Sequence, residues 1–439
     1  MRKMKDSGIE WIGEIPESWT VDKVKYCSNL DSCKLSEHTD PEYEFKYIDI
    51  SSVTEYGGIG ETTEMTFDKS PSRARMVVNN GDIIISTVRT YLKAIAYIDS
   101  LNDHICSTGF CVVTPNKKLH PKFGYYLLQS DYFVQRIVSQ SVGVSYPAIS
   151  SAEIGNMPIV IPSIREQSRI ADYLDQKCAE IDAIIAAKEK TNELLKERRQ
   201  SIIYEAVTKG LDPTVPMKDS GVEWIGEIPM DWDVCPVKYL IDKSHPYPVG
   251  DGDHGMIKAD DYLDEGIPYI RVLNLTWGEG LNLENLVYIS EEMNSRIKNS
   301  ELKPNDILIA KTGATIGKTA IVPDSLPRSN TTSHVGKITI SSDHDSVFFY
   351  YVMTSSIVQK QIQDLSAMQS TRPELGIDGL RNLLVVVPPI GKQRDISEFL
   401  NQQCTEINAV IDTNSSMIDK LKEYRQSVIY EAVTGKIEV

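Results

Sequence analysis

The sequence contains one module twice, and this duplication constrains its fold more than any other feature. Residues 4–19 read MKDSGIEWIGEIPESW, and residues 217–232 read MKDSGVEWIGEIPMDW. A longer repeat relates residues 166–208 to residues 392–434 without a gap. Each half therefore consists of an opening segment, a variable insert and a long segment with helical periodicity. Two similar frames with different inserts predict a pseudo-twofold body that carries two distinct recognition surfaces.

The repeat boundaries divide the chain into six expected segments. These are residues 1–19 (opening repeat), 20–162 (first insert domain), 163–210 (first long helix), 211–232 (second opening repeat), 233–388 (second insert domain) and 389–439 (second long helix). Either insert is long enough to bury a core of its own. The expected class is α+β, with two mixed α/β domains at opposite ends of an antiparallel pair of long helices.

Composition and charge exclude several classes of protein. With 41% hydrophobic and 25% charged residues, the chain is typical of a globular protein. It has neither a run of about 18 apolar residues nor a signal-peptide core, so we expect a cytoplasmic protein without membrane contact. The seven cysteines include no CxxC pair, so we expect neither disulfides nor a metal site. The net charge of −16 disfavours nucleic-acid binding by the isolated chain.

An apolar stripe marks each long repeat as one face of a helix. The stripe positions are spaced alternately by four and three residues, which keeps them on one side of an α-helix. Because a long helix with an exposed apolar stripe is not stable alone in water, its duplicate is the expected partner. Ser163 and Glu166 are spaced as a capping box at the start of the first helix, and Gly210 is expected to end it. The residues expected to pair the helices are Ile170, Leu174, Ile181, Ile185, Leu195, Ile202, Ile396, Leu400, Ile407, Ile411, Ile418, Leu421 and Val428.

Matched runs in the two inserts predict a common frame. The strand-like runs are YIDISSVT from Tyr47, YIRVLNLT from Tyr269, and residues 81–86 and 305–310. The predicted short amphipathic helices are residues 125–138 and 348–362, and the predicted closing strands are residues 154–162 and 380–388. Between these runs the two sequences differ, and divergent loops on a shared frame are where recognition residues usually lie.

One pair of candidate recognition loops follows the strands predicted at 81–86 and 305–310. Residues 313–319 (GATIGKT) resemble a P-loop, but they have three residues between the glycines instead of four, so nucleotide hydrolysis is not expected. Residues 87–93 (TVRTYLK) contain no glycine. Both loops carry hydroxyls and cations suited to phosphate or base-edge contacts, although a solvated hairpin is the alternative. The candidate contacts are Arg89, Thr90, Tyr91, Lys93, Lys311, Thr312, Thr315 and Lys318, with Arg271 and Asn274 in the run from Tyr269.

A second pair of candidate loops precedes the closing strands. The two loops are residues 143–147 (GVSYP) and 369–373 (QSTRP). Arginine can form two hydrogen bonds to guanine, whereas tyrosine can stack or form one, so the two loops are expected to read different bases unless they are plain exposed turns. The candidate contacts are Ser145, Tyr146, Ser370, Thr371 and Arg372.

The sequence contains no catalytic constellation that we can identify. The seven histidines form no HExxH motif, no Ser/His/Asp set is evident, and no glycine-rich cofactor fingerprint occurs, so no catalytic residue is expected. The opening repeats, with Trp11, Trp19 and their counterparts Trp224 and Trp232, are predicted to pack against the body as straps.

Taken in order, these features resemble a known family. The opening repeat DSGIEWIGEIPESW, an insert, the proline-rich entry PSIREQ and a long helix ending RRQSIIYEAVTKGL, followed by the same plan again, are similar to the specificity subunit of type I restriction-modification systems. The resemblance covers essentially the full length. It departs from the pattern at the second helix entry, PPIGKQ, where Lys392 stands in place of Glu166.

The resemblance implies partners, cofactors and a division of labour. The inserts would be two target-recognition domains that read a bipartite target in double-stranded DNA, and the helices would be the spacer between them. The implied partners are two modification subunits, which carry S-adenosylmethionine, and two restriction subunits, which use ATP and Mg²⁺, so this chain would hold no cofactor. Basic surface on those subunits would offset the negative charge. The alternative is a coiled-coil scaffold whose inserts bind proteins; basic concave faces on the inserts would favour DNA, and acidic faces would favour protein.

Overall fold

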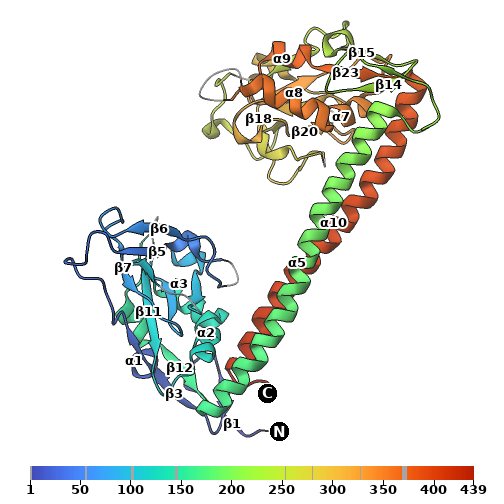
Figure 1. The fold of residues 1–439 in the computed structure, drawn as a ribbon. Coiled ribbons are helices and arrows are strands. Elements are labelled where there is room, and N and C mark those ends of the chain that lie inside the picture. The colour runs from blue at the N-terminus through green and yellow to red at the C-terminus, as the bar shows by residue number, and fades with distance from the viewer. Residues whose placement is uncertain are drawn as a thin grey trace. The chain divides into compact units, whose positions relative to one another are not determined.

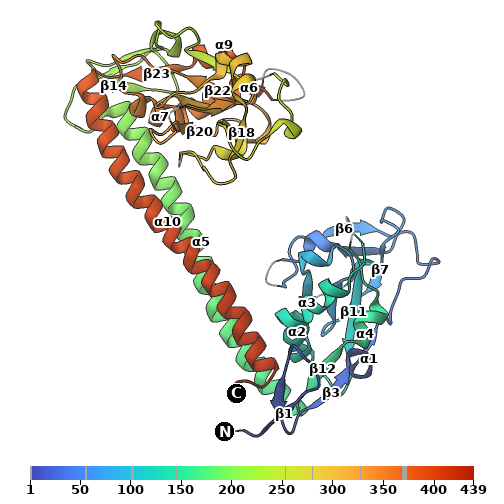
Figure 2. The ribbon, with the colours of Figure 1, turned by 180° about the vertical axis from the view of Figure 1, so that it is seen from behind.

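The computed structural model describes residues 2–54, 57–99, 103–143, 147–252, 254–278, 280–326, 328–367 and 373–439. These residues form two compact units, one made of residues 1–188 and 416–439 and the other of residues 189–415. Each unit contains one opening repeat, one insert domain and a part of each long helix (Figure 1 and Figure 2). The predicted α+β class with an internal duplication is confirmed.

The first insert domain contains two four-stranded sheets. One sheet has three antiparallel pairs and the order β4 (Ser28–Leu30), β11 (Phe110–Pro115), β8 (Ile83–Ser86), β9 (Ile95–Tyr97). In the other sheet β5 and β10 are parallel, and the order is β6 (Thr63–Thr66), β5 (Glu44–Ile48), β10 (His104–Ser107), β7 (Ala74–Val77). Two further antiparallel pairs close the opening repeat and join the ends of the insert: β1 (Met4–Asp6) with β2 (Glu14–Pro16), and β3 (Thr20–Lys23) with β12 (Pro158–Ile161).

The second insert domain repeats this plan with one sheet reduced. Its antiparallel four-stranded sheet has the order β16 (Val249–Asp251), β22 (Val335–Ile338), β19 (Ile307–Ala310), β20 (Thr319–Ile321). The other sheet has three strands in the order β18 (Val287–Ile289), β17 (Ile267–Ile270), β21 (Asn330–Thr331). The pairs β13 (Met217–Asp219) with β14 (Glu227–Pro229) and β15 (Asp233–Pro236) with β23 (Leu384–Val387) correspond to the two extra pairs of the first unit.

The helices of the inserts differ from the sequence prediction at one point in each copy. The single helix predicted at 125–138 is wrong, because α2 (Pro121–Gln129) and α3 (Asp131–Gln140) are separated at Ser130, whose ψ is 143°. The helix predicted at 348–362 is broken in the same way between α7 (Ser346–Thr354) and α8 (Ser356–Ala367), at Ser355. Both serine hydroxyls donate to the carbonyl three residues earlier, a local bond that competes with continuation of the helix. The shorter helices are α1 (Val24–Cys27), α4 (Ser151–Asn156), α6 (Glu291–Arg296) and α9 (Ile377–Asn382).

The runs from Tyr47 and Tyr269 were predicted as strands over their full length, and this prediction is wrong for their second halves. β5 ends at Ile48 and β17 ends at Ile270, and each strand turns into a short 3-10 helix, Ile50–Ser52 and Val272–Asn274. The cause is a side-chain cap: Asp49 and Arg271 donate their backbone N–H groups to the Ser52 hydroxyl and the Asn274 amide oxygen. A polar side chain three residues ahead thus ends each strand.

Two long helices, α5 (Ile164–Lys209) and α10 (Ile390–Val433), lie side by side and antiparallel (Figure 1 and Figure 2). In the second unit Arg199 contacts Asn408 and Asn192 contacts Asn414, an order that requires antiparallel chains. α5 ends where predicted, since Gly210 has φ 77°. Half of the predicted capping box is present: Glu166 N donates to Ser163 Oγ at 3.4 Å, while the Glu166 carboxylate pairs with Arg2.

Each unit has its own hydrophobic core, to which both long helices contribute. In the first unit the fully buried Trp19 shares a core with the end of α10, including Val433. In the second unit Trp232 shares a core with the end of α5, including Val207. The opening repeats therefore pack as straps on the end of a helix, as expected, except that Trp224 of the second repeat is 47% exposed.

Candidate nucleic-acid interface

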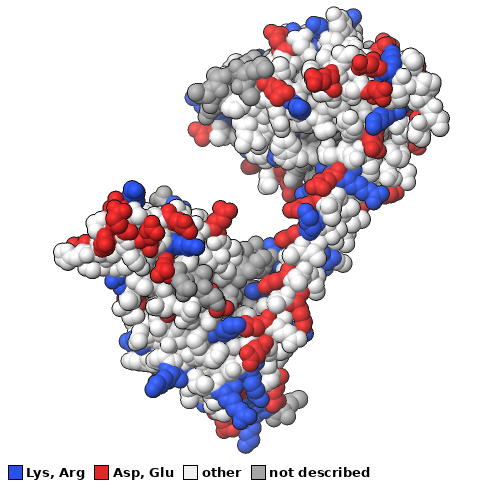
Figure 3. Space-filling view, in the orientation of Figure 1, with Lys and Arg blue, Asp and Glu red and all other residues white. Residues whose placement is uncertain are grey.

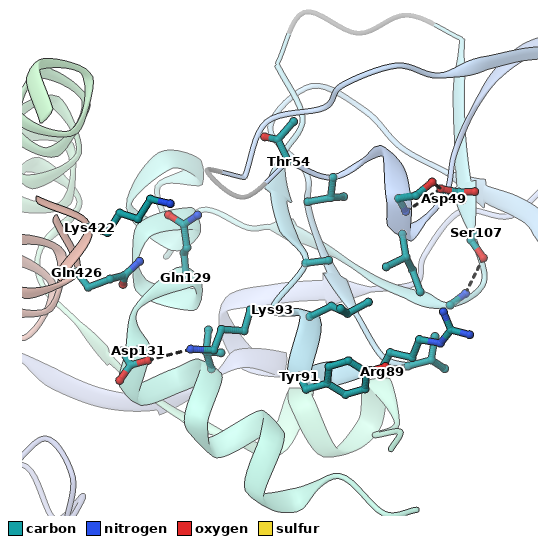
Figure 4. A pocket seen from close by; sticks show the side chains of 18 of the residues that line it. Asp49, Thr54, Arg89, Tyr91, Lys93, Ser107, Gln129, Asp131, Lys422 and Gln426 are labelled. Carbon is teal, nitrogen blue, oxygen red and sulfur yellow. Dashed lines mark hydrogen bonds and ion pairs between the residues drawn. The ribbon is translucent and has the colours of Figure 1, made fainter. Parts of the chain in front are cut away.

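A groove of about 1900 Å³ opens in the first unit and brings several distant segments together. One side, the loop wall, consists of residues 49–54, 88–94 and 107–109. The other side, the helix wall, consists of Lys422, Glu423, Arg425, Gln426, Ser427 and Tyr430 of α10. The junction of α2 and α3, from Gln129 to Val134, completes the lining. Figure 4 shows Lys422 and Gln426 on the helix side and Arg89, Tyr91 and Asp49 on the loop side.

The loop predicted to carry recognition residues, 87–93, is a strained and well-supported turn in this groove. Arg89 and Lys93 both have left-handed backbones, with φ of 50° and 52°, on either side of a 3-10 turn at Thr90–Leu92. Non-glycine residues rarely adopt this conformation, and such strain persists where surrounding contacts fix the chain. Those contacts include Arg89 N donating to Pro147 O at 2.8 Å and a 2.8 Å bond between the Thr90 and Ser141 hydroxyls.

The side chains of this turn differ in what they can contact. Thr90 is 3% exposed and its hydroxyl is engaged within the fold, so it supports the turn. Tyr91 and the neighbouring Leu92 are exposed, at 54% and 49%, which leaves a ring and an alkyl group available for a ligand. Lys93 lies 3.6 Å from the Asp131 carboxylate, an exposed pair of small energetic weight.

Asp49 supplies an acceptor at the edge of the same groove. Its Oδ1 accepts bonds from the backbone N–H groups of Ser51 and Ser52, at 2.8 and 3.2 Å, and from the Ser51 hydroxyl at 2.6 Å. These bonds fix the orientation of the carboxylate, which lines the groove (Figure 4). A fixed carboxylate at a recognition surface can accept a hydrogen bond from an exocyclic amino group of a base.

The charge of the groove lining differs from that of the whole chain. Its charged members are five cations and three carboxylates, namely Arg73, Arg89, Lys93, Lys422 and Arg425 against Asp49, Asp131 and Glu423. The chain as a whole carries −16, and Figure 3 shows acidic side chains gathered near β5 and β6 at the far end of the first insert domain. A basic bias in the concave region of an acidic chain favours an anionic ligand.

The groove is also lined by buried phenols and amides. Burial raises the pKa of Tyr132, and its hydroxyl has no hydrogen-bond partner among the described residues. The side-chain oxygens of Gln129 and Gln426 are likewise buried and without a partner in the part of the chain that the structure describes. Such groups are normally satisfied by water or by a polar ligand.

The corresponding loop of the second unit, between β19 and β20, is a hairpin turn. Lys311 is 2% exposed and pairs with Asp251, so its charge is used inside the domain. The Thr312 hydroxyl bonds to His334 Nδ1 at 2.9 Å, and the Thr315 hydroxyl donates to Thr312 O at 3.2 Å. Lys318 is partly exposed at the end of the turn, directly before β20. A strand and not a helix follows the glycines, in agreement with the sequence argument against a P-loop.

Arg271 and Asn274 occupy the position that Asp49 and Ser52 occupy in the first unit. Asn274 is fully buried, and its amide accepts from Arg271 N and donates to Asn282 O. The Arg271 guanidinium donates to Asn285 O at 2.9 Å and lies 5.5 Å from the centre of the Tyr262 ring. Asn274 is therefore a capping residue. The site that carries the acid Asp49 in the first domain carries the base Arg271 in the second.

Five predicted contacts lie outside the described residues: Ser145, Tyr146, Ser370, Thr371 and Arg372. They stay predictions. The residues around them are informative, since Pro147 anchors the Arg89 turn and Pro373 O accepts from Gly313 N at 3.4 Å. In each copy, the proline that ends the second candidate loop thus bonds to the first candidate loop.

The predicted helix stripe has two kinds of partner. In the first unit Ile181, Ile185, Ile418 and Leu421 form a cluster between the helices, whereas Ile170, Leu174 and Val428 belong to the core of the insert domain. In the second unit Ile396 and Leu400 belong to the domain core, and Ile202 packs against it. Ile407 and Ile411 are 9% and 7% exposed, and Leu195 is half-buried.

Sequence reasoning missed Asp49, Arg73, Lys422 and Gln426 as groove residues. Two signals were present. The aligned runs YIDISS and YIRVLN differ by Asp49 against Arg271 at an otherwise similar site. The helices carry KERRQS at 196–201 and KEYRQS at 422–427, polar sequences that a purely apolar stripe does not explain.

The described residues contain no cluster of histidine, cysteine and acidic side chains that could hold a metal ion. Among the same residues, none of the helices combines the length and apolar composition that a membrane crossing requires.

Comparison with known proteins gives consistent relatives. The chain matches the family model of the type I restriction modification DNA specificity domain twice, over residues 18–196 and 252–414. The type I restriction enzyme EcoBI specificity subunit of Escherichia coli is 25% identical over 343 residues, covering 77% of this chain and 69% of that protein. The MjaIX specificity subunit of Methanocaldococcus jannaschii is 22% identical over 439 residues, covering 98% and 95%. A solved structure reported for complex assembly and conformational transition of the type I R-M system has a TM-score of 0.71 at 22% identity, covering 96% of this chain and 99% of that one.

The duplicated frame, the paired helices and the two unlike insert domains define a recognition protein with two separate reading units. The family matches cover more than half of the sequence, once in each repeat. The chain therefore belongs to the type I restriction modification DNA specificity family.

Proposed function

We propose that this chain is the DNA-specificity subunit of a type I restriction-modification complex. Each insert domain reads one half of a bipartite target in double-stranded DNA, and the DNA between the halves is not read. The observation that carries the proposal is the double family match in a chain whose two repeats share a frame but differ in their exposed loops. Because the frame is shared, it positions the two insert domains in the same way. Because the loops differ, we expect them to read different sequences.

The groove of the first domain supports DNA as the ligand in preference to protein. Five cations against three carboxylates line it, in a chain that is otherwise acidic; one of the five, Arg425, is paired with Asp182. Tyr91 and Leu92 are exposed on a rigid turn, and Asp49 presents an oriented acceptor. Cations bind the phosphates of DNA, and oriented polar and apolar groups can contact the edges of the bases.

In this proposal the chain performs no covalent chemistry. Two modification subunits bring S-adenosylmethionine, two restriction subunits bring ATP and Mg²⁺, and the specificity subunit tells them where to act. We retain as proposed DNA contacts the candidates whose side chains are accessible, such as Arg89, Tyr91 and Lys318. We reassign Thr90, Lys311 and Asn274 to support of the reading surfaces, because they are buried and bonded within the fold.

The proposal is tested by replacing the first insert, residues 20–162, with the equivalent insert of a relative. The methylated sequence of a host carrying the hybrid is then mapped across the genome. We expect one half of the motif to change and the other half, with the spacer, to stay. Loss of both halves in a complex that still assembles would contradict independent reading by the two domains.

A further inference from the structure

The helix wall of the groove belongs to the opposite repeat from the loop wall. Lys422, Gln426 and Tyr430 line the groove of the first insert domain, yet they lie on α10, which follows the second insert. Their spacing of four residues places them on one face of the helix. In Figure 4 the side chains of Lys422 and Gln426 extend from α10 toward Gln129 of α2. Any ligand in this groove therefore meets both repeats.

The helix wall is the same in both repeats, whereas the loop wall is not. The sequence KEYRQSVIY at 422–430 corresponds to KERRQSIIY at 196–204, so Lys422, Gln426 and Tyr430 have exact counterparts. The loop TVRTYLK at 87–93 corresponds to GATIGKT at 313–319, which shares almost nothing with it. The helix wall is constant while the loop wall differs between the repeats. We therefore expect the helix wall to contact a feature common to all DNA sequences, namely the phosphate backbone.

The helix wall is also held in place before any ligand binds. Arg425, which is 5% exposed, donates to both oxygens of Asp182 on α5, at 2.9 and 3.3 Å. Its charge is therefore used within the helix pair, and Lys422 is the lysine that the helix wall contributes to the groove lining. The side-chain oxygens of Gln426 and Gln129 have no partner in the described residues. Because these oxygens are acceptors, water or another donor would satisfy them, and a phosphate would be met by the N–H₂ group of the Gln426 amide.

We propose that Lys422 and Gln426 form a phosphate-anchoring site for the DNA that the first insert domain reads. Lys196 and Gln200 of α5 form the corresponding site for the second insert domain. The ligand is a backbone phosphodiester, contacted by the lysine ammonium and by the amide N–H₂ group of glutamine. This inference rests on the proposed function. It adds that the helix of one repeat anchors the DNA read by the other.

Lys422→Ala is the direct test, with Lys420→Ala as the matched control. Lys420 lies two residues away on α10, is exposed, carries the same charge, and is not among the groove residues. The full-length chain, assembled with modification subunits of the same host, is titrated with cognate, half-site-mismatched and unrelated duplexes at several salt concentrations. Complex assembly and thermal unfolding of both variants show whether the fold is intact.

We expect Lys422→Ala to weaken binding to every duplex by the same factor and to leave the sequence preference unchanged. Loss of one phosphate contact lowers the salt slope by about 0.9, so the fall in affinity between 50 and 200 mM salt becomes about threefold smaller. Lys420→Ala should keep the wild-type slope. Lys196→Ala should reproduce the effect of Lys422→Ala.

Two outcomes would overturn the anchor. Equal salt slopes for Lys422→Ala and Lys420→Ala would place the phosphate contacts elsewhere, and a changed base preference in Lys422→Ala would make the residue a reader. In both cases the wild-type complex still distinguishes cognate from unrelated duplexes, so the proposed function stands. If the wild-type complex makes no such distinction, the proposed function itself is wrong, and the anchor with it.

Discussion

At the scale of single residues, Asp49 is the sharpest candidate for a base contact. Asp49→Asn keeps an Oδ1 that can cap Ser51 and Ser52, but it replaces the second oxygen with an N–H₂ donor. The carboxylate can accept from the amino group of cytosine or adenine, and the amide can donate to guanine or thymine. We expect the preference at one position of one half-site to shift by about 1–3 kcal/mol, measured by titration with a set of single-substituted duplexes.

Asp40→Asn is the matched control for this change. Asp40 is exposed and, like Asp49, its Oδ1 accepts from a nearby backbone N–H, that of Glu42 at 3.0 Å, but it does not line the groove. It should bind all duplexes as the wild type does. If Asp49→Asn also keeps every base preference, Asp49 is a capping residue and no more.

In the proposed DNA complex, Arg372 is the predicted base contact of the second domain and Lys318 its predicted phosphate contact. Arg372→Ala should relax specificity in one half-site, because a bidentate contact to guanine discriminates by about 1–3 kcal/mol. Lys318→Ala should weaken specific and non-specific DNA alike and lower the salt slope by about one. Titrations of both variants at several salt concentrations separate these results, and equal losses on every duplex for Arg372→Ala would make it a phosphate contact.

At the scale of elements, a polar pair in each unit links the two long helices. Arg425 pairs with Asp182 in the first unit, and Arg199 donates to Asn408 at 2.5 Å in the second. Asp182→Ala leaves the buried guanidinium without its carboxylate. We expect a loss of about 3 kcal/mol in the free energy of unfolding, at the low end for a buried pair, because the Asp182 side chain is 30% exposed.

Chemical denaturation of the purified chain measures this loss. Asp172→Ala, an exposed aspartate on the same helix, should change the free energy of unfolding by less than about 0.5 kcal/mol. If Asp182→Ala and Asp172→Ala behave alike, the ion pair does not stabilise the helices.

The elements also show how much of the fold can be predicted from the sequence alone. Periodicity predicted both long helices and the end of α5 at Gly210, because these features depend on local spacing and on one backbone conformation. It missed the breaks at Ser130 and Ser355, since a single hydroxyl bond decides them within an otherwise helical pattern. The groove was harder to predict. Asp49 and Lys422 are far apart in sequence, and a pattern within either segment gives no information on their proximity.

At the scale of the whole molecule, the two separate cores predict two unfolding transitions. Trp19 is fully buried in the core of the first unit and Trp232 is 3% exposed in that of the second. Each substitution to alanine should cost about 3–5 kcal/mol in its own unit. Calorimetry combined with limited proteolysis should show a lowered transition for the unit that carries the change. A single transition that shifts equally for both variants would mean that the units unfold together.

The first unit is discontinuous in sequence, and this fact sets an order for its synthesis. Its core includes Ile15 and Trp19, made at the start, and Ile429 and Val433, made near the end, whereas residues 189–415 form the other unit without interruption. On the ribosome, a domain can complete its packing once all of its segments have emerged. The second unit is therefore ready first. The first insert domain, although translated earlier, must wait with an apolar face uncovered until the end of α10 reaches it, so chaperones should hold nascent chains at this stage.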